Sequence, residues 1–77
     1  MGDYVKKVKQ IISVKAGVDI SEISNEEYFE EDLNIGELEL IEILSEIEDA
    51  LQVNLMDKKN DIECVQDLVD ILAEKLE

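Results

Sequence analysis

Residues 36–51 read GELELIEILSEIEDAL, and this stretch decides the fold. At 100° per residue, its apolar positions fall on one stripe along a helix. The stripe consists of Leu40, Ile43, Leu44, Ile47 and Leu51, and the acids Glu39, Glu42, Glu46 and Asp49 lie on the other side. The pattern predicts an amphipathic helix over residues 37–51, with Gly36 as an acceptable N-cap.

Two further stretches show the same three- and four-residue spacing of apolar side chains. The first predicts a helix over about residues 3–16, marked by Val5, Val8, Ile12 and Ala16. Gly17 follows it, where a left-handed C-terminal cap is expected. The second predicts a last helix, marked by Val65, Leu68, Val69, Leu72 and Leu76.

The segments between these helices are expected to be irregular. Residues 17–36 form a long loop, a feature that is uncommon in compact domains and tends to be functional. Phe29 and Leu33 are expected to pack this loop onto the core, and Ser24 and Glu27 have the spacing of a capping box that starts a short turn. One short helical turn is expected around residues 57–61. The chain is therefore predicted to be a single all-α domain, residues 1–77: a four-helix bundle with three longer helices, one short helix and a long loop after the first.

The charge is concentrated in the middle of the chain. The 77 residues carry a net charge of −14, and the stretch from Ala16 to Asp57 holds fourteen carboxylates and no Lys or Arg. Outside it, seven acids balance seven lysines. Such a field repels nucleic acid and anionic membranes, whereas it attracts a basic patch on another protein. We expect a monomer that binds basic-patched proteins, although a merely solubilising acidic surface is the alternative.

The residue inventory excludes most catalytic and metal chemistry. There is no His, so Ser-His and Cys-His nucleophile systems are absent, and zinc ligands are too few. Asp57, Asn60 and Asp61 do not follow the ligand pattern of a calcium loop. No apolar pocket is expected beside the paired carboxylates, so we predict no enzyme activity, no catalytic residue and no metal site.

Cysteine usage and hydropathy bear on the compartment. Cys64 is the single cysteine, so no internal disulfide can form, which favours a reducing environment. No signal-peptide pattern and no apolar run long enough to span a bilayer is seen. A cytoplasmic location without a membrane span is expected.

Two apolar residues of the second predicted helix lie off its core stripe, among acids. Leu38 and Ile41 are expected to face water, although scattered exposed Leu is ordinary. Apolar residues inside a charged rim are also typical of a docking face. The candidate partner-binding residues are therefore Glu37, Leu38, Ile41, Glu42, Glu48 and Asp49.

Several segments in order resemble the acyl carrier protein family over nearly the whole chain. Residues 29–33 (FEEDL) look like the family's F-x-E-D-L before its attachment motif, and residues 38–43 (LELIEI) look like the start of its second helix. Residues 8–12, 17–19, 23–25 and 65–72 are similar to the family's opening and last helix. The resemblance implies the helical bundle of that family and a 4′-phosphopantetheine arm that carries acyl groups as thioesters.

The family's attachment motif, Asp-Ser-Leu, reads Gly36-Glu37-Leu38 in this chain. Glu37 occupies the position of the serine, and a carboxylate cannot attack the coenzyme A pyrophosphate as the serine hydroxyl does. The resemblance therefore implies that the arm is absent and that no cofactor is carried. Glu37 is interpreted as a favourable helix-start carboxylate, or alternatively as an imitation of the arm's phosphate.

Three functions follow from these observations. The first is a carrier-like protein that docks on partner enzymes through its second helix without an arm. The second is a specialised acyl carrier of fatty-acid or polyketide-type biosynthesis, with an attachment chemistry that the motif does not identify. The third is a regulatory or structural acidic subunit that binds a basic partner by charge alone.

Overall fold

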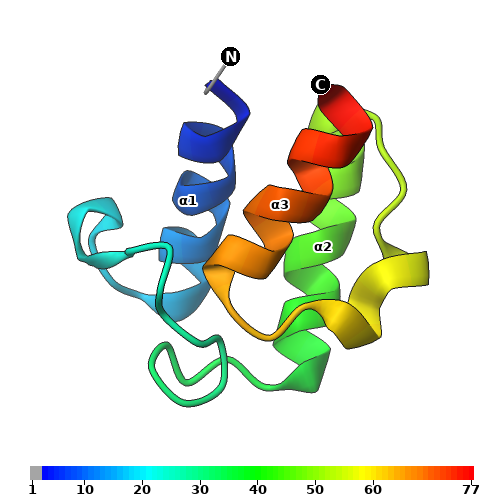
Figure 1. Cartoon of the computed structure of the whole chain (residues 1–77). Helices are drawn as coiled ribbons and strands as arrows, with labels where there is room; N and C mark the ends of the chain where they lie inside the picture. The colour runs from blue at the N-terminus through cyan, green and yellow to red at the C-terminus, as the bar shows by residue number, and fades with distance from the viewer. Residues whose placement is uncertain (1–2) are drawn as a thin grey trace.

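A computed structural model describes residues 3–77 and contains three α-helices and two short 3₁₀ helices. The α-helices are α1 (Asp3–Ala16), α2 (Glu37–Leu51) and α3 (Val65–Leu76). The 3₁₀ helices are η1 (Ile20–Glu22) and η2 (Met56–Asp61). In Figure 1, α1 runs in the opposite direction to α2 and α3, and the long loop between α1 and α2 covers one end of the bundle. The predicted all-α bundle with three longer helices is confirmed.

The core is made only of aliphatic side chains and one aromatic ring. Its members come from all three α-helices and from the loops. They are Val8, Ile12, Ile23, Phe29, Leu33, Ile35, Ile43, Leu44, Ile47, Leu55, Ile62, Val65, Leu68 and Leu72. All five predicted stripe positions of α2 pack as expected, with Ile43, Leu44 and Ile47 fully buried and Leu40 and Leu51 partly buried against the core.

The long loop is attached to the chain just before α3. Phe29 donates its backbone N–H to the carbonyl of Glu63 (3.0 Å), and Val65 donates to the carbonyl of Glu27 (3.0 Å). These bonds accompany a single antiparallel bridge between Tyr28 and Cys64, so no strand forms within residues 3–77. As predicted, Phe29 and Leu33 are buried and hold the loop on the core.

The loop contains the predicted short turn at Ser24 and Glu27, and in addition one helical turn that was not predicted. In the short turn the Glu27 N–H bonds to the Ser24 carbonyl (3.2 Å). The helical turn lies earlier, at η1, where Glu22 donates to the carbonyl of Asp19 (2.9 Å). Three residues are too few to show an apolar period, so this element leaves no sequence signal.

Helix ends follow simple capping chemistry. Gly17 has φ of 74°, the left-handed conformation predicted for the end of α1. At the end of α2, Gln52 adopts a left-handed conformation (φ of 57°), and its N–H bonds to the Glu48 carbonyl (2.8 Å). At the start of α3, the Asp67 carboxylate accepts the N–H groups of Glu63 (3.0 Å) and Cys64 (3.3 Å). These local bonds fix where each helix begins and ends.

Truncating the buried side of α2 should unfold the protein more easily than truncating its exposed side. We expect Leu44→Ala or Ile47→Ala to lower the free energy of unfolding by about 2–5 kcal/mol, because each leaves a cavity in a closed core. Leu38→Ala is the matched control, since this leucine is 77% exposed. Urea denaturation followed by circular dichroism measures both; an equal loss for Leu38→Ala would contradict the assignment of faces.

Candidate functional site

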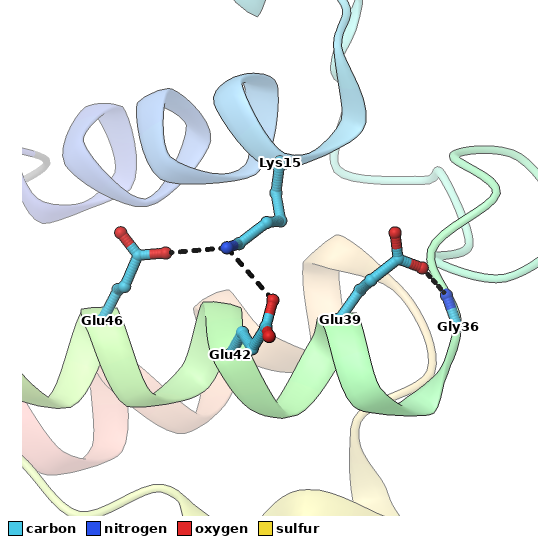
Figure 2. A network of polar contacts seen from close by, with 5 residues as sticks. All are labelled: Lys15, Gly36, Glu39, Glu42 and Glu46. Carbon is cyan, nitrogen blue, oxygen red and sulfur yellow. Dashed lines mark hydrogen bonds and ion pairs between the residues drawn. The ribbon is translucent and has the colours of Figure 1, made fainter.

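The start of α2 is arranged by a side chain that reaches back to the N-cap. Gly36 donates its N–H to the Glu39 carboxylate (2.9 Å), as the close-up of Figure 2 shows. The Glu39 carboxylate therefore already accepts a hydrogen bond from the N-cap of its own helix. Glu37, the first residue of α2, points elsewhere and accepts a hydrogen bond from the Lys59 ammonium of η2 (3.0 Å).

The outer face of α2 carries one strongly exposed apolar side chain. Leu38 is 77% exposed, and Ser45 and Asp49 follow it on the same side of the helix. Ile41 is only half-buried, so the expectation that it faces water fully is met in part. The Asp49 carboxylate makes no ion pair or hydrogen bond with residues 3–77.

A lysine of α1 bridges two acids on one edge of this face. The Lys15 ammonium lies 3.1 Å from the Glu42 carboxylate and 3.5 Å from that of Glu46 (Figure 2). The hydrogen bond to Glu42, together with the charges of both acids, raises the pKa of Lys15 above its ordinary value. Lys15 thus joins α1 to α2 and partly neutralises the acidic edge that Glu42 was predicted to supply to a partner.

Glu48 has a structural task that the sequence did not reveal. Its half-buried carboxylate accepts the backbone N–H groups of Leu55 (2.6 Å) and Met56 (3.1 Å) at the start of η2. This side chain therefore holds the segment between α2 and η2 against α2. Less of its charge is available to a partner than that of Asp49.

A cavity of about 410 Å³ lies beside the N-terminal end of α2, between the long loop and η2. Its floor consists of core side chains, among them Phe29, Ile35 and Ile62. Charged residues line its rim: the acids Glu30, Glu31, Glu37 and Glu63, and the base Lys59. No apolar pocket was predicted beside the carboxylates, and this cavity is lined by charged as well as apolar residues. The cavity depends on the packing of segments far apart in sequence, which periodicity cannot detect.

Residues 3–77 contain neither a membrane-spanning helix nor a cluster of metal ligands. From Asp3 to Glu77, no helix combines the length and apolar character needed to cross a membrane. Over the same residues, no cluster of three or more His, Cys, Asp or Glu side chains is arranged to hold a metal ion. Cys64 is partly exposed and immediately precedes α3, the boundary position expected for a small residue.

Three α-helices, a long loop packed ahead of the second helix and an acidic second helix define a carrier-protein type of bundle. No family model matches the chain. Over 73 residues the chain is 33% identical to an acyl carrier protein of Rubrobacter xylanophilus, an alignment that covers 94% of this chain and 90% of the relative. The chain therefore belongs to the acyl carrier protein family.

The stability of this acidic bundle should rise with salt. Ions screen the repulsion behind the −14 net charge, and they also weaken the four surface ion pairs seen among residues 3–77. Exposed pairs contribute only about 0–1 kcal/mol each, so the repulsion should dominate. We expect the Tm to rise as NaCl is raised to about 0.1 M, where the Debye length is about 10 Å.

Millimolar magnesium or calcium should raise the Tm further, because divalent ions are attracted more strongly to clustered carboxylates. Differential scanning calorimetry gives both effects, with choline chloride at matched ionic strength as the control. A Tm that is flat or falls with salt would show that the carboxylates do not destabilise one another.

Proposed function

We propose that this protein is an armless member of the family, which docks on basic-patched partner enzymes through the exposed face of α2 and catalyses no reaction itself. The observation that carries the proposal is the start of α2. Glu37, which takes the place of the family's attachment serine, is held by Lys59 at 3.0 Å beside an exposed Leu38. The acidic face is present, whereas the attachment hydroxyl is not.

The residues near Glu37 do not fit an attached phosphopantetheine. Attachment needs a hydroxyl at the start of α2, and Glu37 offers a carboxylate. Ser45 is exposed on the same helix but lies two turns further on. Ser13 lies on α1, where its hydroxyl donates to the Gln10 carbonyl (2.8 Å). We therefore derive no role for the arm in this chain.

The docking face combines one apolar contact with unpaired acid. Leu38 supplies the exposed apolar surface, and Asp49 supplies a carboxylate that no cation of residues 3–77 neutralises. Glu42 and Glu37 extend the acidic character on either side, although each already pairs with a lysine. A partner with a basic patch around an apolar depression is complementary to this arrangement.

Offered coenzyme A and a broad-range phosphopantetheinyl transferase, the purified protein should keep its mass. The reason is the missing hydroxyl at position 37. Intact-mass spectrometry is the measurement, with a serine-containing acyl carrier protein as the positive control. A gain of one phosphopantetheine would overturn the armless assignment and favour a specialised carrier of fatty-acid or polyketide-type biosynthesis.

The double variant Gly36→Asp/Glu37→Ser restores the attachment motif and should be loaded in the same assay. The backbone tolerates it, because Gly36 has an extended conformation and an added Cβ would lie 3.5 Å from the nearest Glu39 oxygen, an ordinary contact. A folded double variant that is never loaded would place the fault in the alignment of this motif or in the transferase contacts around it.

Charge reversal should separate a docking face from diffuse attraction. Asp49→Lys on α2 should weaken binding to a carrier-dependent synthase and slow association, whereas Glu74→Lys on α3 changes the net charge equally and should leave binding unchanged. Leu38→Ala should also weaken binding. Biolayer interferometry on the immobilised synthase measures all three, with an unrelated basic protein as the surface control.

Equal losses for Asp49→Lys and Glu74→Lys would mean that charge alone attracts the partner. The regulatory or structural acidic subunit would then be the better description of the protein.

A further inference from the structure

We propose that the cavity beside the N-terminal end of α2 is a binding site for an arginine side chain of the docked partner, and that Lys59 is its built-in competitor. The inference rests on the proposed docking function and names the chemistry that the partner must present. It concerns the cavity floor of Phe29, Ile35 and Ile62 and the acidic rim above it.

The cavity matches a long side chain that is apolar along its length and cationic at its tip. The floor residues are core side chains that are only 2–4% exposed, and the more exposed Tyr28 and Leu40 line the cavity beside them. The rim holds four carboxylates against one ammonium. Arginine and lysine lay their methylene stems on apolar surface and keep the charged end at a polar rim. The volume of about 410 Å³ falls in the lower part of the range of about 300–1,000 Å³ found for ligand pockets.

The rim selects against other ligands. An anionic ligand would meet Glu30, Glu31, Glu37 and Glu63, whose charges exceed that of Lys59. A neutral apolar ligand would fill the floor but leave the carboxylates without a new partner. The positive end of the α2 dipole opposes a cation, but the acids in the first turn, Glu37 and Glu39, offset it.

Lys59 already makes the contact that the proposal assigns to the partner. Its side chain lines the cavity and is only 26% exposed, and its ammonium lies 3.0 Å from the Glu37 carboxylate. The protein's own lysine thus already places an ammonium at the acidic rim. A partner cation that bonds to Glu37 must share that carboxylate with Lys59 or displace it.

Arginine is favoured over a second lysine because unused acceptors surround the cavity. The side chains of Glu30, Glu31 and Glu63 form no ion pair or hydrogen bond with any part of the chain from Asp3 onward. A guanidinium has five donors in a planar fork, so it can bond to one of these carboxylates and also to Glu37 in place of Lys59. An ammonium has no such geometry.

The test replaces Lys59 with methionine, which removes the ammonium and keeps an unbranched apolar side chain. Lys59→Met should tighten binding of an amphipathic Leu/Lys helical peptide that carries one central arginine, by about two- to five-fold, the factor expected when an exposed ion pair no longer competes. Lys9→Met is the matched control: it changes the net charge equally, and Lys9 lies on α1, away from the cavity lining. The same peptide with citrulline, which is neutral, in place of arginine should gain nothing. Isothermal titration calorimetry at fixed salt measures each pair.

Amide chemical shifts locate the bound peptide and separate the two proposals. The arginine peptide should shift the amides of Phe29, Ile35 and Ile62 in addition to those of Leu38 and Asp49. Shifts confined to Leu38 and Asp49 would overturn the cavity site and leave the docking face in place. Equal gains for Lys59→Met and Lys9→Met, or for the citrulline peptide, would also overturn it. No shift on α2 at all would contradict the docking function itself.

Discussion

The backbone bonds that tie the long loop to the segment before α3 control the rest of the structure. They join Phe29 to Glu63 and Val65 to Glu27. Because Phe29 is also buried, the loop cannot leave the bundle without opening the core. The tie sets the position from which the chain enters α2, and it brings the loop's acids, Glu30 and Glu31, to the cavity rim. The site is therefore a product of loop attachment as much as of the helix.

The distribution of the lysines decides which acids of α2 are paired and which are left exposed. Lys15 and Lys59 come from outside the strongly acidic stretch, yet they bond to Glu42, Glu46 and Glu37 within it. Each pair is exposed to water and adds little stability. They neutralise the two edges of α2 and leave Leu38 and Asp49 between them unpaired. These internal cations thus limit the proposed docking face to the side chains that they leave without a partner.

The helices could be predicted from the sequence because their signals are local. A core stripe such as Leu44 and Ile47, with Gly36 and Gly17 at helix ends, places each element within a short window. The bond between Glu37 and Lys59 spans 22 positions and joins two different elements, so no window contains it. The cavity is equally non-local. Glu48 was predicted to face a partner, but its carboxylate bonds to the backbone of Leu55 after α2. This orientation depends on tertiary contacts, which a local sequence pattern does not contain.

Glu37 gains a physical explanation once its partner is known. A carboxylate at the first position of α2 is favoured by the helix dipole whatever the protein does. The Glu37 side chain is 76% exposed and bonds to Lys59 beside the cavity. In the proposed function, an acid in place of the attachment serine therefore does more than remove a hydroxyl. It forms an ion pair with Lys59 between the cavity and the proposed docking face, at the carboxylate for which we propose that a partner cation competes.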